Sequence, residues 1–283
     1  MKRHQRQRLI SIAILILLIA TALFVLKEKG VLCCGGSQSS QQDLPVVSGE
    51  PIAQGSPQPL SPQETKKPVS DPDNPPDIYT TEFDYALVPE SDGELPYVEI
   101  NNNEPFFSDA DKGRVDAFEI YSDLDSLGRC GVAYANICVD LMPTEPRGEI
   151  GSIKPSGWKQ AKYDKDMVEG GYLWNRCHLI GFQLAGENAN KLNLITGTRY
   201  LNVTGMLVFE DQVASYVKDE PGNHVLYRVT PVFVDNELVA RGVLIEAYSV
   251  EDGGELQFCI YCYNIQPGIG IDYQTGESWE DYE

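Results

Sequence analysis

The sequence predicts an α+β domain that follows one transmembrane helix and a disordered linker. Three observations carry this prediction: an apolar run near the N-terminus, a long segment rich in Ser, Gln, Pro and Gly, and a C-terminal region in which strand patterns flank one helical pattern. The hydrophobic content of 42% is ordinary for a chain that builds a globular core.

The apolar run predicts a single-pass membrane anchor. Residues 1–8 form a basic stub, and residues 9–26 contain only Ser11 and Thr21 as mildly polar members. A helix of this length rises about 27 Å, close to the thickness of the hydrocarbon core. Because basic flanks stay in the cytoplasm, we expect the rest of the chain outside the cell. A cleavable signal peptide is the alternative, but its apolar core is usually shorter, about 7–15 residues.

Residues 27–82 predict a flexible tether. They are rich in Pro, Ser and Gln and nearly free of aromatic residues, so they cannot bury enough apolar surface to offset the entropy of ordering. Such a segment links the membrane to a domain at residues 83–283, and proteolysis within it would release that domain.

The elements of the domain follow from their residue patterns. The segment Val203–Asp219 predicts a helix, because its apolar residues Val203, Leu207, Ala214 and Val217 recur at helical spacing on one stripe that should face the core. Strands are expected where β-branched and aromatic residues cluster between turn residues, at 115–122, 131–139, 224–234, 238–250 and 256–265.

Glu210 interrupts the apolar stripe of the predicted helix. A carboxylate in that position must be paired or carry a function, because burying it alone is costly. The alternative is a slightly rotated helix that turns Glu210 toward solvent.

Three polar residues suggest a metal-dependent phosphodiesterase site. His178 ends an expected strand, Asn202 begins the helical segment, and Glu210 follows eight residues later. Eight residues correspond to about 80° in helical projection, so both side chains can lean toward one point. A hard cation such as Mg²⁺ needs few protein ligands there, because it keeps most of its waters and bridges to phosphate.

Here the sequence resembles a known family. The stretch Asn175-Arg176-Cys177-His178-Leu179 is similar to the Asp-Arg-Gly-His motif of the DNA/RNA non-specific endonucleases, the ββα-metal nucleases, in the form found in secreted streptococcal-type DNases. The run 193–210 is similar to the segment that carries the family's metal-binding asparagine, and the likeness extends over 97–279. The resemblance implies a ββα-metal nuclease fold with a central mixed or antiparallel sheet.

The resemblance also implies roles. His178 matches the general base, Asn202 the side-chain ligand of Mg²⁺ or a similar ion such as Mn²⁺, and Glu210 the acid that holds metal-bound water. Asn193 matches an asparagine that supports the site. Arg176 is expected to contact phosphate or stabilise the transition state, although a structural ion pair is an equal alternative.

The charge distribution bears on the substrate. The formal net charge of −20 opposes nucleic-acid binding, but residues 151–200 hold seven basic and four acidic residues. We expect this window to face the substrate backbone, without reading bases. Its candidate phosphate-binding residues are Arg199, Lys154, Lys159 and Lys162.

Two departures from the family motif matter. Asn175 replaces an aspartate, so a carboxylate that orients the histidine must come from elsewhere or be absent. Cys177 replaces a glycine and raises the alternative of a Cys–His hydrolase, but adjacent residues of a strand point to opposite faces. Among the other cysteines, Cys130 and Cys138 are the expected disulfide.

The sequence therefore predicts a membrane-anchored, metal-dependent endonuclease that hydrolyses phosphodiester bonds in DNA, and RNA as well, outside the cell. No protein partner is expected. Two alternatives remain: a catalytically silent surface module that binds nucleic acid or protein on the same scaffold, and a secreted toxin.

Overall fold

A computed structural model of the chain describes residues 76, 78 and 83–281, all of which belong to one unit, Gln63–Glu283. The predicted membrane span at 9–26 lies outside the described residues, as does nearly all of the predicted linker. Within the part that the structure describes, no helix is long and apolar enough to cross a bilayer.

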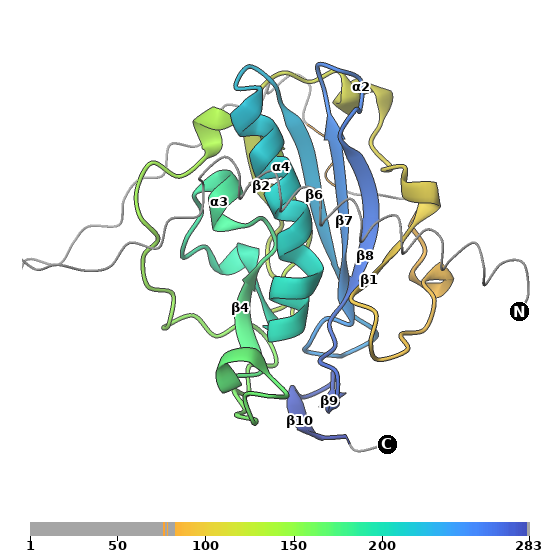
Figure 1. Cartoon of the computed structure of the whole chain (residues 1–283), viewed down its shortest axis with the longest axis vertical. Helices are drawn as coiled ribbons and strands as arrows, with labels where there is room; N and C mark the ends of the chain where they lie inside the picture. The colour runs from red at the N-terminus through yellow and green to blue at the C-terminus, as the bar shows by residue number, and fades with distance from the viewer. Residues whose placement is uncertain (1–75, 77, 79–82, 282–283) are drawn as a thin grey trace, which may run out of the picture. The chain divides into compact units, whose positions relative to one another are not determined.

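A six-stranded sheet forms the centre of the domain, and every pairing in it is antiparallel. The five predicted strands are confirmed, and a short N-terminal strand extends the sheet at one edge (Figure 1). In spatial order the strands are β1 (Tyr97–Glu99), β8 (Gln257–Tyr263), β7 (Gly242–Ser249), β6 (Val225–Val232), β3 (Ala133–Ile137) and β2 (Phe118–Tyr121).

One face of the sheet is covered by the predicted helix, which runs in nearly the same direction as the strands in Figure 1. The helical segment begins with a π-helical turn, Leu201–Met206, and continues as α4, Leu207–Asp219. Val213, Ala214 and Val217 of α4 are buried against the sheet. The opposite face is covered by the chain before β1, where Phe83 and Tyr85 pack on Tyr261.

A β-ribbon beside this helix carries the histidine. Strand β4 (Trp174–His178) pairs with β5 (Leu194–Thr198), and the short helix α3 (Phe182–Ala185) follows β4. The remaining elements are the helix α2 (Asp109–Lys112), the ribbon β9 (Ile269–Asp272) with β10 (Glu277–Glu280), and single 3₁₀ turns at Tyr85–Leu87, Asn101–Asn103, Val139–Leu141, Glu169–Gly171 and Lys191–Asn193.

The expected disulfide between Cys130 and Cys138 is wrong. Both thiols are free, as are those of the other cysteines that the structure describes. Strand β3 runs between the two residues, and a strand advances about 3.3 Å per residue. Its length separates the cysteines well beyond the Cα distance of about 4.4–6.8 Å that a disulfide needs.

Candidate active site

A cavity of about 250 Å³ lies between the end of β4 and the start of the helical segment. His178, Asn202 and Glu210 all line it, so the structure brings together the three residues that the sequence singled out. The remaining lining residues are Arg147, Gly181, Phe182, Arg199, Val203 and Leu207.

The hydrogen bonds of His178 define its tautomer. Its Nε2 lies 2.9 Å from the backbone oxygen of Asn188, and a carbonyl only accepts, so Nε2 carries the proton. Nδ1 is therefore the unprotonated nitrogen, and it accepts a hydrogen bond from Arg147 Nη2 at 3.3 Å. Burial lowers the pKa of His178, and the charge of Arg147 lowers it further, so the imidazole is neutral at pH 7.

Asn193 fixes the chain that follows His178. Its Oδ1 accepts from the backbone N–H of Ile180 at 2.8 Å, and its Nδ2 donates to the backbone oxygen of Ile180 at 2.9 Å. The backbone oxygen of Asn193 also accepts from Leu179 N–H at 2.9 Å. This buried side chain therefore holds the backbone of the residues that directly follow His178.

The π-helical turn changes the predicted stripe. Val203 and Leu207, expected in the core, line the cavity instead, and Leu207 is 36% exposed. In the turn the N–H of Leu207 bonds to the oxygen of Asn202, one residue farther back than in an α-helix. A π-helical turn holds more residues than an α-helical turn. The side chains of Asn202 and Glu210 are therefore separated by a smaller angle around the helix axis than the value of about 80° expected for a continuous α-helix.

Glu210 is 9% exposed, so the alternative in which it turns toward solvent is wrong. Burial raises the pKa of Glu210 to about 7. Gly181 makes room for the carboxylate: a Cβ at that position would lie 2.6 Å from Glu210 Cδ and closer still to Oε2.

Arg147 is the residue that sequence reasoning missed. It lies on an exposed loop whose next residue, Gly148, abuts Asn188: a Cβ on Gly148 would lie 2.9 Å from Asn188 Nδ2. Proline and glycine flank this loop without any periodic pattern, so nothing local distinguishes Arg147 from other surface arginines. Only the fold brings its guanidinium to His178.

The two predicted arginines differ in their relation to the cavity. Arg199 lines it and bonds to Glu169 and Asn175, at 3.3 Å and 3.5 Å. Arg176 does not line it: its guanidinium donates to the backbone oxygens of Gly151 and Ile153 and stacks on the ring of Trp158.

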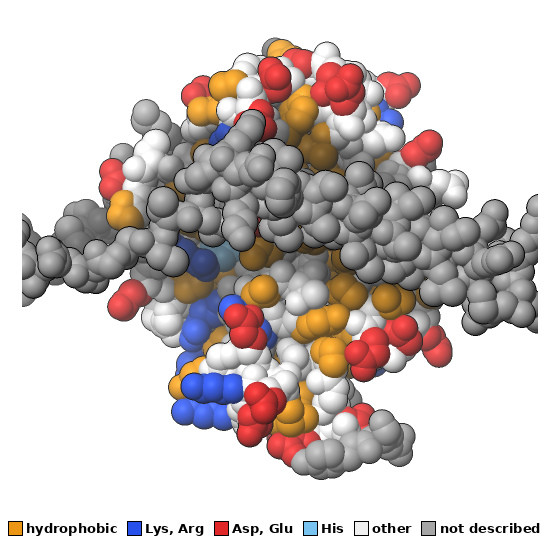
Figure 2. Space-filling model, in the orientation of Figure 1, with side chains coloured by type: hydrophobic (Ala, Val, Ile, Leu, Met, Phe, Trp, Pro, Cys, Tyr) orange, Lys and Arg blue, Asp and Glu red, His pale blue; other side chains and the backbone are white. Residues whose placement is uncertain are grey.

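Three predicted phosphate-binding lysines are exposed on the segment before β4. Lys159 pairs with Glu277 at 2.8 Å, Lys162 lies over the ring of Tyr172, and Lys154 is also exposed. Figure 2 shows Lys and Arg side chains gathered on one side of this face, whereas Asp and Glu side chains dominate its top and its other side. Substrate phosphates would be attracted to the basic side.

The Cys–His alternative fails on geometry. Cys177 Sγ points to Asn202 and Met206, whereas the His178 ring contacts Arg147 and Asn188. Burial also raises the pKa of Cys177 well above its usual value, so the group stays a thiol.

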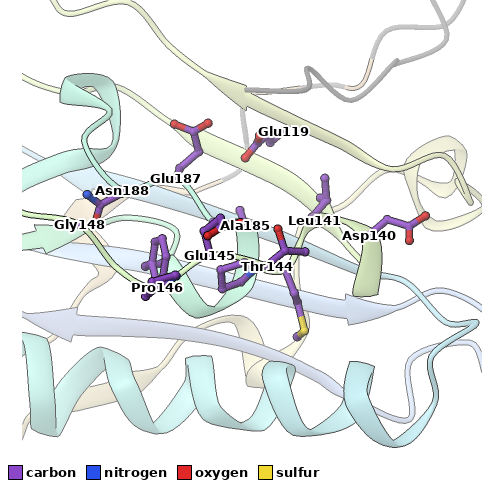
Figure 3. Close-up of a pocket in the computed structure, with 14 residues that line it drawn as sticks. Glu119, Asp140, Leu141, Thr144, Glu145, Pro146, Gly148, Ala185, Glu187 and Asn188 are labelled. Atoms are coloured by element: carbon purple, nitrogen blue, oxygen red, sulfur yellow. The ribbon is translucent and has the colours of Figure 1, made fainter. Parts of the chain in front are cut away.

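A second, larger cavity of about 560 Å³ shares Phe182 with the first but is acidic. Figure 3 shows the side chains of Glu119 and Glu187 together on one side of it. Burial raises the pKa of Glu119 to about 7, and the neighbouring Glu187 adds to the effect. Carboxylates repel phosphate, so the smaller cavity is the better site for a phosphodiester.

The smaller cavity suits a hydrated divalent cation. It offers the amide oxygen of Asn202 and the carboxylate of Glu210, which are the hard donors that Mg²⁺ prefers. Among the described residues no group of three His, Cys, Asp or Glu side chains could enclose an ion.

Comparisons with known proteins find similar sequences. A family model described as DNA/RNA non-specific endonuclease matches residues 110–251. A deoxyribonuclease of Streptococcus dysgalactiae subsp. equisimilis is 33% identical over 109 residues, which is 37% of this chain and 32% of the relative. The match thus spans about a third of that relative's length.

Solved nuclease structures are also similar to this chain, two of them as follows. NucA from Streptococcus agalactiae with a bound magnesium ion superposes with a TM-score of 0.57 and 28% identity over 67% of this chain and 91% of that chain. Sda1 nuclease with a bound zinc ion superposes with a TM-score of 0.55 and 26% identity over 66% of this chain and 96% of that chain.

The family model covers half of the chain, including the site residues from Arg147 to Glu210, and the solved structures share the α+β fold with its antiparallel sheet. The chain belongs to the DNA/RNA non-specific endonuclease family.

Proposed function

We propose that this chain is a divalent-cation-dependent endonuclease that hydrolyses phosphodiester bonds of DNA and RNA without sequence preference. The observation that carries the proposal is the fixed tautomer of His178. Its Nε2–H donates to the backbone oxygen of Asn188, so Nδ1 is the basic nitrogen. His178 lines the same cavity as Asn202 and Glu210, where this nitrogen can act.

In the proposed reaction, His178 Nδ1 takes a proton from the attacking water, and its lowered pKa keeps it ready to do so at neutral pH. Arg147 and Arg199 donate to the phosphate oxygens, on which negative charge develops. Asn202 and Glu210 would hold Mg²⁺ or Mn²⁺, directly and through water. The cation supplies positive charge that polarises the phosphate and stabilises the leaving oxygen.

The alternative of a silent binding module predicts binding without cleavage. The test is to incubate the full chain with supercoiled plasmid and with RNA, in Mg²⁺, Mn²⁺ or EDTA, and to measure DNA binding by fluorescence anisotropy in parallel. We expect nicked and linear plasmid and shortened RNA with either ion, and none with EDTA. Folded protein that binds DNA but leaves it intact under every ion would favour the silent module.

The location outside the cell is also part of the proposal. It rests on the sequence pattern of residues 1–26, with basic residues before an apolar run. Protease treatment of intact bacterial cells that express the chain should remove the domain while leaving cytoplasmic proteins whole. Protection of the domain until the cells are lysed would contradict this location.

A further inference from the structure

The thiol of Cys177 contacts the candidate metal ligand. Cys177 Sγ lies 3.2 Å from Asn202 Oδ1 and 3.4 Å from Met206 Sδ. A thiol has a single proton, and a carbonyl oxygen accepts it better than a thioether does. The thiol therefore donates to Asn202.

The surroundings of Cys177 hold this contact in place. The residue is fully buried in β4, directly before His178, and faces the π-helical turn. Behind it, β5 carries Gly197, where a Cβ would lie 2.7 Å from Cys177 Cβ. Because glycine has no side chain, Gly197 leaves the space that Cys177 fills. The strand that carries the base and the turn that carries the ligand are thus joined by one side-chain hydrogen bond.

We propose that Cys177 is a positioning residue, whose thiol holds the side chain of Asn202 in the orientation that binds the divalent cation. The inference rests on the proposed function and adds a residue to it. A carbonyl oxygen has two lone pairs, so accepting from the thiol leaves one free for a cation. Without the donor, the amide of Asn202 can rotate and must be ordered again at each binding event.

Serine and alanine at position 177 separate this role from packing. The two side chains are similar in size, but only serine can donate to Asn202 Oδ1. Partners that orient a metal ligand are worth about 10–100-fold in affinity, and a thiol is a weak donor. We expect Cys177→Ala to weaken Mn²⁺ binding about tenfold and Cys177→Ser to recover most of the loss.

The measurement is a titration of the full chain with Mn²⁺, with the free ion followed by electron paramagnetic resonance, alongside the Mg²⁺ concentration for half-maximal plasmid cleavage. Cys259, also fully buried but on β8 and in another part of the core, provides the control pair Cys259→Ala and Cys259→Ser. Thermal unfolding monitors packing, for which a buried serine is no better than alanine.

The outcomes are distinct. Weaker binding in Cys177→Ala with recovery in Cys177→Ser, and no change in the Cys259 pair, would support the positioning role. Equal affinity in wild type and Cys177→Ala, or equal losses in the alanine and serine variants, would overturn it. Wild-type protein that neither binds Mn²⁺ nor cleaves DNA would instead contradict the proposed function itself.

Discussion

At the scale of single residues, the site depends on small side chains as much as on the reactive ones. Gly181 has backbone angles that any residue adopts, φ −57° and ψ 142°, yet it lies against the carboxylate of Glu210. Its lack of a side chain is needed for the position of that carboxylate and not for the backbone.

Gly181→Ala should therefore fold normally and lose activity. The added methyl group displaces only the end of a flexible side chain, so the free energy of unfolding should change by less than about 1 kcal/mol. A displaced catalytic group can cost about 100-fold in rate. Thermal unfolding and plasmid cleavage check both parts, and wild-type cleavage by Gly181→Ala would show that the position of Glu210 is not critical.

Truncation of Arg147 should change both the rate and its pH dependence. Alanine at this position removes the proposed donor to the phosphate, and loss of such a donor typically costs about 10²–10³ in rate. It also removes the positive charge that lowers the pKa of His178, so the acid limb of the rate profile should move to higher pH.

Arg147→Lys is the matched variant, because it keeps the charge but loses the planar fork. Its acid limb should stay close to that of the wild type while its rate falls. A profile that does not move in Arg147→Ala would mean that the guanidinium and His178 are not coupled.

The residues differ in how far the sequence revealed them. His178, Asn202 and Glu210, which line one cavity in the structure, could be predicted as candidates because each stands out in a local pattern: a motif, a helix start and an interrupted stripe. Arg147 and the Asn188 oxygen could not, because one lies on a loop without periodicity and the other is a backbone atom. Their roles arise only from tertiary contact with His178.

At the scale of elements, the π-helical turn Leu201–Met206 sets the geometry of the site. The sequence predicted a continuous helix from Val203, because apolar spacing does not distinguish a π turn from an α turn. Gly205 within the turn is buried against the sheet. A Cβ added to Gly205 would lie 3.5 Å from Cys262 Cβ on β8.

Inserting one alanine after Thr204 tests the turn. Thr204 is exposed, so the insertion point lies away from the core. One added residue corresponds to about 100° of rotation, which would turn Asn202 away from Glu210. We expect cleavage to fall at least 100-fold while helicity by circular dichroism is kept.

Thr204→Ala is the control, since it changes the side chain without changing the length of the turn. It should cleave at nearly the wild-type rate. Wild-type activity in the insertion variant would contradict the importance of the length of this turn.

At the scale of the whole molecule, the five strands expected from composition all join one sheet, whereas the ribbons β4–β5 and β9–β10 were not delimited. The central strands are buried on both sides and rich in β-branched and aromatic residues, which makes them visible in sequence. The spatial order of the strands was not predictable, because it depends on contacts between segments far apart in the chain.

The acidic cavity links the stability of the whole domain to pH. The pKa of Glu119 is about 7 in the folded protein against an ordinary 4.5, so the unfolded chain loses this proton first. Stability should fall as the pH rises from 4.5 to 7, and the full penalty is present above 7. Because Glu119 is partly exposed, the penalty should be about 1 kcal/mol.

Glu119→Gln should therefore unfold at a higher temperature than the wild type at pH 8 and at nearly the same temperature at pH 4. Asp140→Asn, an exposed substitution beside the same cavity, is the control and should show little difference at either pH. An equal gain for Glu119→Gln at both pH values would rule out titration of Glu119 as the cause.

The most direct test of the proposed chemistry is the rate of plasmid cleavage in saturating Mg²⁺ for His178→Ala beside His224→Ala. His224 is also a histidine in the same domain, but its Nδ1 bonds to Glu251 and it does not line the cavity. Loss of a general base costs about 10²–10⁴ in rate, so His178→Ala should be nearly inactive while His224→Ala cleaves like the wild type. Comparable cleavage by folded His178→Ala and wild type would mean that the reaction is carried out by other residues.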